Sequence, residues 1–170
     1  IKDKPGSGMH INISVKGTEE KAEEYFMAGV MKHIREITAF LNPMKSSYDR
    51  FGEHKAPKYV SWSRENRSQL IRIPAADGEY RRFELRSPDP SANVYLAYAL
   101  LLYSGIDGIR SRIALPEPCD MNLFSAPESV TDKLERLPQS LDEAVKLALD
   151  SGFVSGIIPK SITECIAGNE

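Results

Sequence analysis

The chain has 170 residues, of which 41% are hydrophobic and 27% are charged, and its formal net charge is -2. This size and composition suit one domain of mixed α and β structure with its own hydrophobic core. The near-neutral charge offers no basic field for a nucleic acid or an anionic membrane, and the longest apolar run, 96–103, is too short to span a bilayer.

The first predicted element is a strand. Residues 9–15 alternate between apolar and polar side chains, which is typical of a half-buried strand. Its polar face would carry His10, Asn12 and Ser14. Gly6-Ser7-Gly8 predicts a tight turn in front of this strand, where the backbone can come close to a ligand.

A long amphipathic helix follows over 18–41. Apolar residues recur at helical spacing, Thr18 can cap the helix, and Glu19 and Glu20 would lie in its first turn. Asn42-Pro43 predicts its end. His33 lies near the apolar stripe, so we expect it to be a packing residue.

The middle of the chain predicts a loop over 44–57 and short strands over 58–63 and 69–73. A further strand over 82–86 would place Arg82, Glu84 and Arg86 on one face. Such a face is either a solvated charge ladder or a place where anions and a metal ion meet.

The second half predicts mainly helix. Asp89 and Pro90 match the cap and the first position of a helix whose segment 95–106 is apolar nearly all round, which predicts a buried helix ending near Gly105 and Gly108. After the irregular stretch 111–126, Ser140 and Glu143 form a capping box for a helix over 141–150.

Several kinds of site are absent from the sequence. It contains no Walker loop, no HExxH, no GxSxG and no Rossmann fingerprint, and Cys119 and Cys165 are too far apart to suggest a disulfide framework or a zinc site. We therefore expect a reducing cytoplasm. Dispersed arginines suit phosphates and carboxylates, and carboxylate plus imidazole suits Mg²⁺ or Mn²⁺.

Four motifs occur in a fixed order, namely Gly6-Ser7-Gly8-Met9-His10, Ser47-Tyr48-Asp49-Arg50, Asn66-Arg67-Ser68 with Ile71-Arg72-Ile73-Pro74, and the segment 82–90. With them, the stretch from Pro5 to Phe124 resembles the C-terminal part of the catalytic domain of glutamine synthetase, and the resemblance continues more weakly through the helix at 141–150. It implies an α+β fold in which an antiparallel-rich sheet is packed with helices, part of a glutamine synthetase/guanido kinase-like catalytic fold.

The resemblance also implies a domain assignment. Residues 1–170 would be the C-terminal portion of that catalytic domain, without its N-terminal β-grasp domain and its upstream catalytic strands. The opening Ile1-Lys2-Asp3 without an initiator Met fits a piece of a longer protein. We expect this piece alone to be inactive and to bind ATP weakly.

Site roles are implied residue by residue. The metal ligands would be His10 and Glu84; the substrate-binding residues Gly6, Arg50, Arg67 and Arg86; the ATP-binding residues Asn12, Ser14, Arg67, Arg72 and Arg82; and the catalytic residues Arg50, Arg67 and Arg86. The cofactors would be ATP and Mg²⁺ or Mn²⁺.

The implied reaction joins ammonia to the side-chain carboxylate of glutamate through an acyl phosphate. Phosphoryl transfer of this kind depends mainly on positioning and on charge neutralisation. Besides glutamate, ammonia and ATP, the implied partners are further copies of the parent chain, since the family forms ring-shaped dodecamers. We expect no nucleic acid and no membrane partner.

The sequence departs from the family pattern at several places. Asn12 replaces a frequent histidine, Pro5 a frequent Asn and Glu79 a frequent Lys, while Lys55 stands before Ala56-Pro57 where the family has a flap Glu. Either Glu53, two residues earlier, reaches the site by a different path, or the flap carboxylate is missing.

These departures leave two alternatives. One is a γ-glutamyl ligase for a larger amine, similar to a γ-glutamylpolyamine synthetase, and the other is a non-catalytic relative. A further departure is Phe124, which replaces the tyrosine that some bacterial members adenylylate. We therefore expect no regulation by that route.

Overall fold

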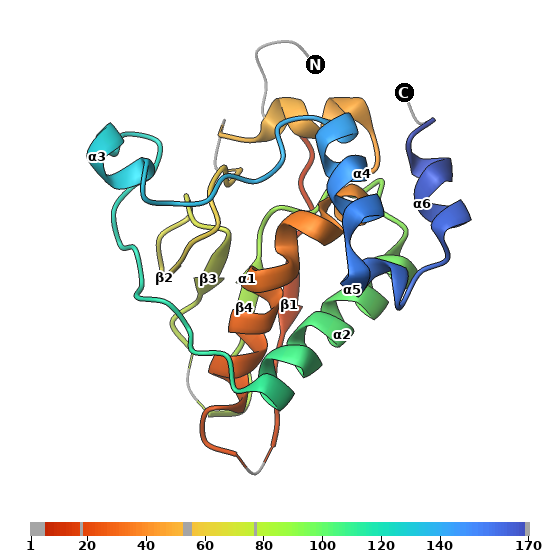
Figure 1. The fold of residues 1–170 in the computed structure, drawn as a ribbon. Coiled ribbons are helices and arrows are strands. Elements are labelled where there is room, and N and C mark those ends of the chain that lie inside the picture. The colour runs from red at the N-terminus through yellow and green to blue at the C-terminus, as the bar shows by residue number, and fades with distance from the viewer. Residues whose placement is uncertain (1–5, 18, 53–55, 77, 169–170) are drawn as a thin grey trace.

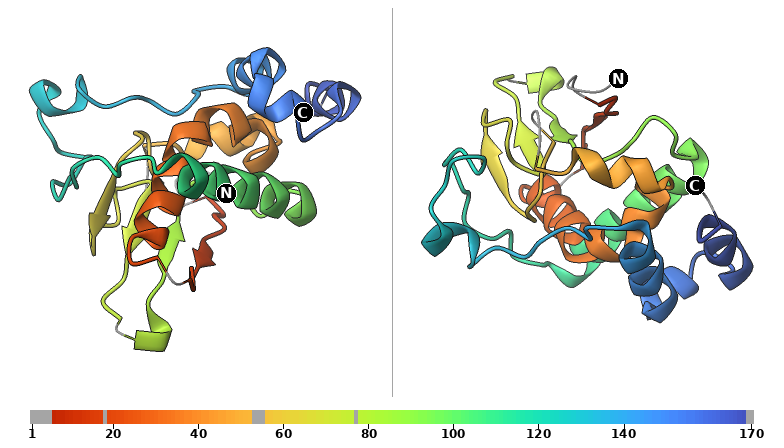
Figure 2. Two further views of the ribbon diagram at one scale, coloured as in Figure 1. Left: turned by 60° about the horizontal axis from the view of Figure 1, so that its bottom comes forward. Right: turned by 90° about the horizontal axis from the view of Figure 1, so that it is seen from above.

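The computed structural model describes residues 6–17, 19–52, 56–76 and 78–168 of the chain (Figure 1). In these ranges a small sheet is packed with helices, which confirms the predicted α+β class. Figure 2 shows the long helices gathered beside the sheet. None of the helices in the described ranges is long and apolar enough to cross a membrane.

A four-stranded mixed sheet forms the centre of the fold, in the order β1-β4-β3-β2. The strands are β1 (Ile11–Ile13), β2 (Trp62–Arg64), β3 (Ile71–Ile73) and β4 (Phe83–Leu85). Two of the three pairings are antiparallel and β2 runs parallel to β3. All four strands are shorter than predicted, and β2 begins late because Tyr59 forms only an isolated bridge with Arg136.

The helix α1 (Ala22–Leu41) covers the sheet, and the rings of Phe26 and Phe83 lie 5.9 Å apart. It begins later than predicted because residues 19–21 form a turn, in which the Ala22 amide donates to the Glu19 carbonyl. The predicted cap Thr18 lies outside the described residues. The predicted end is confirmed, since Asn42 is the C-cap.

The helix α2 (Val94–Ser111) runs beside α1 at a very short distance. A Cβ atom added at Gly29 would overlap the Ser104 carbonyl oxygen, and one added at Gly108 would overlap the Tyr25 carbonyl oxygen. Gly105 and Gly108 therefore serve this close contact. The prediction that the helix ends near them is wrong, because α2 continues to Ser111.

The start of α2 also differs from the prediction. Asn93 is its N-cap and accepts hydrogen bonds from the amides of Tyr95 and Leu96 at 3.0 and 3.3 Å. Asp89 does not cap the helix, because its carboxylate accepts instead from the Ser91 amide and hydroxyl at 2.9 and 2.6 Å.

The prediction that α2 is buried on all sides is wrong. Its face toward α1 is buried, whereas the opposite face exposes large apolar side chains, with Tyr95 82% exposed. The others are Val94, Tyr98, Leu102, Tyr103 and Ile106. Apolar composition could not reveal this, because it does not say which neighbours cover a helix.

The segment after α1 is not wholly a loop. It contains the 3₁₀ helix η1 (Lys45–Arg50), whose Tyr48 ring packs edge to face on that of the following Phe51, 5.6 Å away. Residues 53–55, including Glu53 and Lys55, lie outside the described residues.

The C-terminal third contains short helices. They are α3 (Glu128–Thr131), α4 (Leu141–Asp150), α5 (Gly152–Ser155) and α6 (Lys160–Ile166), while η2 (Gly78–Tyr80) precedes β4. Of the short helices, α4 and α6 pack against α1 while α3 lies apart from it (Figure 1). The Ser140 cap of α4 is confirmed, with Glu143 donating its amide to the Ser140 hydroxyl. His33 is buried and stacks on Phe153, as a packing residue should, and both cysteines are free.

Candidate metal and anion site

Glu84 lies at the centre of a group of positively charged and hydrogen-bonding side chains. Its Oε1 lies 2.7 Å from His10 Nδ1 and 3.0 Å from Arg86 Nη1, and its Oε2 accepts from Arg72 Nη1 at 2.9 Å. Glu84 is only 8% exposed and Arg86 only 4%. A solvated charge ladder is therefore the wrong interpretation of this strand.

The sheet register brings these residues together. Glu84 on the central strand β4 pairs with Asn12 on β1 and with Arg72 on β3, so the three residues form one row across the sheet. The sequence placed Arg82 on the same face as Glu84. Arg82 contacts a neighbour of Glu84 in this row, since its Nε donates to Asn12 Oδ1 at 3.1 Å, and its Nη1 donates to the Tyr80 carbonyl at 3.1 Å.

The charges of this group act on one another. Burial opposes ionisation of Glu84, but the hydrogen bond from Arg72 and the charges of Arg86 and His10 together outweigh it and hold the pKa of Glu84 below its usual value. Burial, followed by the charge of Arg86, lowers the pKa of His10. The neutral imidazole that results is the form that can bind a metal ion.

Arg50 lies at a second position, against the glycine-rich turn. Its side chain is 8% exposed and forms an ion pair of 3.5 Å with Asp89. A Cβ atom added at Gly6 would lie 3.0 Å from Arg50 Cγ, so the turn packs directly on this arginine. Burial lowers the pKa of Arg50, although a guanidinium keeps its charge at neutral pH.

Arg67 is the most open of the predicted arginines. It is exposed, and within the described ranges no hydrogen bond or ion pair holds its side chain. Its charge nevertheless reaches Arg86, whose pKa is lowered first by burial and in part by Arg67. Arg67 therefore places an exposed cationic head near the Glu84 group.

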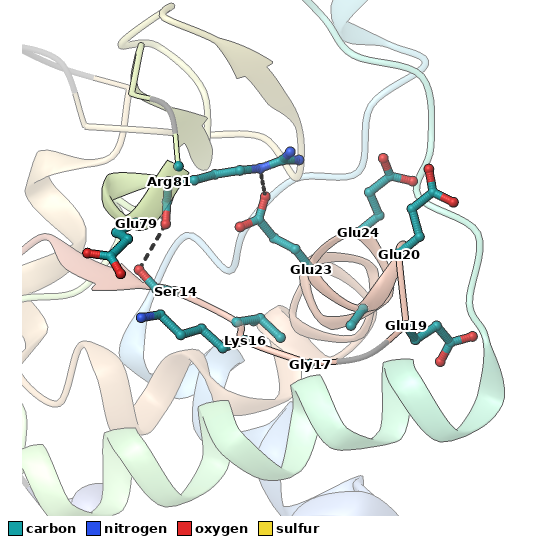
Figure 3. A pocket seen from close by; sticks show the side chains of 12 residues that line it. Ser14, Lys16, Gly17, Glu19, Glu20, Glu23, Glu24, Glu79 and Arg81 are labelled. Atoms are coloured by element: carbon teal, nitrogen blue, oxygen red, sulfur yellow. Dashed lines mark hydrogen bonds and ion pairs between the residues drawn. The ribbon is translucent and has the colours of Figure 1, made fainter.

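Ser14 lies at the edge of a pocket of about 290 Å³ between the end of β1, the start of α1 and η2 (Figure 3). Its hydroxyl donates to the Arg81 carbonyl at 3.0 Å, and Arg81 Nε donates to Glu23 at 2.8 Å. Glu79, which replaces a frequent lysine, also lines this pocket. The structure thus places Ser14 beside an acidic surface, apart from Arg50.

The donor set fits a divalent metal ion only in part. Among the residues the structure describes, no group of three or more His, Cys, Asp and Glu side chains is arranged to hold a metal. His10 and Glu84 offer one imidazole and one carboxylate, whereas Mg²⁺ takes about six oxygen-rich ligands. The pair can supply two positions of a larger site.

Three residues around Arg50 were not predicted as site residues. Asn42, Ser87 and Asp89 all contact its guanidinium, although the sequence assigned Asn42 to a helix end and Asp89 to a helix cap. The signal for them lies in the short motifs 42–43 and 87–90, where polar residues alternate with prolines. Pro5 lies outside the described residues, and Phe124 is 43% exposed.

Comparison with known proteins agrees with this geometry. Residues 1–167 match the family model "Glutamine synthetase, catalytic domain". The chain is 42% identical to a glutamine synthetase of Methanosarcina mazei over 165 residues, which are 88% of this chain and 37% of that protein. It is 42% identical to one of Thermotoga maritima over 157 residues, 83% of this chain and 36% of that protein.

Solved structures agree as well. A GmaS/ADP complex has a TM-score of 0.79 and 27% identity, and it covers 93% of this chain and 40% of its own. An apo GmaS gives a TM-score of 0.77 at 27% identity, over 93% of this chain and 39% of its own. The chain spans less than two fifths of the length of these two curated relatives. On these matches, the chain belongs to the glutamine synthetase catalytic-domain family of ligases.

Proposed function

We propose that this chain supplies the phosphate-binding and glutamate-binding part of a site that joins ammonia to the side-chain carboxylate of L-glutamate with the use of ATP. The observation that carries the proposal is the Glu84 group, in which one carboxylate on the central strand has His10, Arg72 and Arg86 within 3.0 Å. It offers a metal-binding pair directly beside two fixed cations, which is what a phosphoryl-transfer site requires.

The roles divide along the sheet. His10 and Glu84 would hold Mg²⁺ or Mn²⁺, which when bound neutralises phosphate charge. Arg67, Arg72 and Arg82 would contact the phosphates, with Asn12 and Ser14 toward the rest of the nucleotide. Gly6, Arg50, Arg67 and Arg86 would bind glutamate.

The chemistry needs no covalent nucleophile from the protein. A carboxylate oxygen of glutamate attacks the γ-phosphorus of ATP and ADP leaves; the ammonia nitrogen then attacks the acyl carbon, phosphate leaves and the nitrogen loses a proton. Arg50, Arg67 and Arg86 act here as cations that orient the glutamate and stabilise the departing phosphate. This chain contributes the buried, paired guanidinium groups of Arg50 and Arg86 and the exposed cation of Arg67.

We further propose that the complete site needs residues from outside this chain. His10 and Glu84 supply only two ligands, and α2 exposes six large apolar side chains (Val94, Tyr95, Tyr98, Leu102, Tyr103 and Ile106), which suits contact with another part of a parent protein or another subunit. The upstream catalytic strands of a parent protein would complete the metal site. Ring-shaped oligomers would place active sites between neighbouring subunits, and this chain by itself would be inactive.

A second candidate is a γ-glutamyl ligase for a larger amine. It is favoured by Lys55, which stands where the family has a flap Glu, and the GmaS/ADP complex shares this fold. A lysine cannot attract ammonium. A larger amine, whose binding would depend less on a flap carboxylate, would therefore suit this sequence better.

The test is an assay of the full-length protein with glutamate, ATP and either ammonia or a series of amines. Phosphate release that depends on ammonia supports the first proposal, and release that depends on a larger amine supports the second. Glu84→Ala should abolish either activity, whereas the exposed Glu135→Ala should not. Full activity of Glu84→Ala, or no amine-dependent turnover by the wild type, would refute both.

A further inference from the structure

Two of the three guanidinium nitrogens of Arg50, Nε and Nη2, donate hydrogen bonds to other parts of the chain. Nη2 donates to Asn42 Oδ1 at 2.8 Å and to the Ser87 carbonyl at 2.6 Å, and Nε donates to the Ser47 carbonyl at 3.2 Å. Nε also lies 3.5 Å from Asp89 Oδ2. Since a guanidinium has five N–H groups, these bonds leave only the two on Nη1.

The acceptors come from separate segments that are tied to one another. The Asp89 amide donates to the Leu41 carbonyl at 2.9 Å, which joins the turn after β4 to the end of α1. The Met9 amide donates to the Pro88 carbonyl at 2.9 Å, which joins the same turn to the segment before β1. Because these hydrogen bonds link the segments that carry the acceptors, no acceptor of Arg50 on these segments can move without moving the others.

The acceptor side chains are themselves fixed. Asp89 Oδ1 accepts from the amide and the hydroxyl of Ser91, which locks the carboxylate that faces Arg50. Asn42 is fully buried, and its Nδ2 has no hydrogen-bond partner in the described part of the chain. Of the two polar atoms in the Asn42 side chain, only Oδ1 forms a hydrogen bond with a described residue, and its donor is Arg50.

The remaining edge of Arg50 faces the glycine-rich turn. A Cβ atom added at Gly8 would lie 3.2 Å from Nη1, closer than side chains normally approach. Gly8 is exposed, and in the described ranges no protein acceptor bonds to Nη1. The absence of a side chain at position 8 is therefore what leaves this edge open.

We propose that Asn42 and Asp89 are positioning residues that hold Arg50 so that only its Nη1 edge, left uncovered by Gly8, is presented to one carboxylate oxygen of the substrate. The inference rests on the proposed function, because it assigns how Arg50 would meet glutamate. It goes further in assigning roles to Asn42, Asp89 and Gly8. It also excludes a forked contact through Nη1 and Nη2, since Nη2 is already occupied.

The positioning can be tested without a ligand. In the 170-residue chain with ¹⁵N-labelled arginine, NMR should show the Nη2 protons of Arg50 exchanging with water more slowly than the Nη1 protons. Asn42→Ala should reduce this difference, because only the bond to the Ser87 carbonyl then remains on Nη2, whereas Asn42→Asp, which keeps the acceptor oxygen, should retain it in full. Asp89→Asn provides a second variant, which should speed exchange at Nε, if Asn42→Ala fails to fold.

The open edge has its own variant. Gly8→Ala should slow exchange at Nη1 and leave Nη2 unchanged, because the added methyl group covers only that side. Asn122→Ala is the matched control: it removes an exposed Asn side chain that accepts from the Phe124 amide and contacts none of the residues that hold Arg50, and it should alter neither signal. Equal exchange at Nη1 and Nη2 in the wild type, or no response to Asn42→Ala, would overturn the inference.

The functional consequence is measured separately in the full-length protein. Asn42→Ala should raise the KM for glutamate about tenfold with a smaller effect on kcat, because a charge-assisted hydrogen bond is worth about that factor. Asn42→Asp should restore most of the affinity. If the exchange results hold but the KM for glutamate does not respond, then the proposed glutamate contact of Arg50 fails and the positioning remains.

Discussion

His10 Nδ1 lies 2.7 Å from Glu84 Oε1, and the same oxygen receives Arg86 Nη1 at 3.0 Å. With Arg72 on the other oxygen, one carboxylate thereby joins the segment before β1, β3 and the end of β4. A metal ion that bound His10 and Glu84 would enter between groups that already hold each other in place. The site is organised before any ligand binds, which is the condition for efficient electrostatic catalysis.

Glu84→Gln should lower the free energy of unfolding by about 2 kcal/mol, because it removes the carboxylate charge that pairs with the buried Arg86 and the half-buried Arg72. The measurement is urea denaturation at pH 7. The control is Glu135→Gln, which breaks a single exposed pair with Arg35 and should cost less than about 1 kcal/mol. Equal losses in the two variants would contradict the central role of Glu84.

The register of the sheet explains why the sequence could predict only part of this site. The alternation in 82–86 correctly indicated a strand with Glu84 on its polar face, because that information is local. That Arg72 would be its neighbour, and that Arg82 would turn to Asn12, depends on how three strands pair. No pattern within one strand specifies that pairing.

The helices show the same limit. The apolar stripe and Asn42-Pro43 correctly predicted the body and the end of α1, since both signals lie in the helix itself. The start of α2 was misplaced because Asp89 resembles a cap, yet its carboxylate is used by Arg50 and Ser91. Arg50 lies 39 residues before Asp89 in the chain, so the local motif around Asp89 could not reveal this contact.

The contact between α1 and α2 should not tolerate a side chain at Gly29. Gly29→Ala places a methyl group against the Ser104 carbonyl and the backbone of Gly108, so the helices must separate along a buried surface. We expect a loss of about 3 kcal/mol in unfolding free energy, measured by thermal or urea denaturation. Gly152→Ala, whose added Cβ would meet nothing within 4 Å, should change stability by less than about 0.5 kcal/mol.

Asp107 should contribute pH-dependent stability. Hydrogen bonds from His33 and Lys32 hold its pKa below the ordinary value of 3.8. A carboxyl with a lowered folded-state pKa stabilises the protein fully above its unfolded-state pKa and loses that contribution as the pH falls through the folded-state pKa. The difference in unfolding free energy between wild type and Asp107→Asn should therefore be constant from pH 7 to about pH 5 and shrink below about pH 4.

The measurement is denaturation of both proteins in parallel across this pH range. Asp150→Asn is the control, because Asp150 is exposed and has no side-chain hydrogen bond or ion pair within the described residues. Its difference from wild type should show no comparable change with pH. A wild-type advantage over Asp107→Asn that grows as the pH falls below 4 would have the wrong sign for this interaction.

Arg67 offers a test that separates function from stability. Its side chain is exposed and makes no hydrogen bond or ion pair in the described ranges, so Arg67→Ala should change the unfolding free energy by less than about 0.5 kcal/mol. If it contacts the phosphates and glutamate as proposed, the same variant of the full-length protein should lose about a hundredfold in kcat, since one charge-assisted contact to developing charge is worth about that factor. Steady-state phosphate release and thermal unfolding measure the two effects.

The control is Arg110→Ala, which removes another exposed arginine, on the last turn of α2, and should be neutral in both assays. A functional loss matched by an equal loss of folded protein would instead place Arg67 among the structural residues, because an arginine that only supports the fold cannot reduce turnover while stability is unchanged.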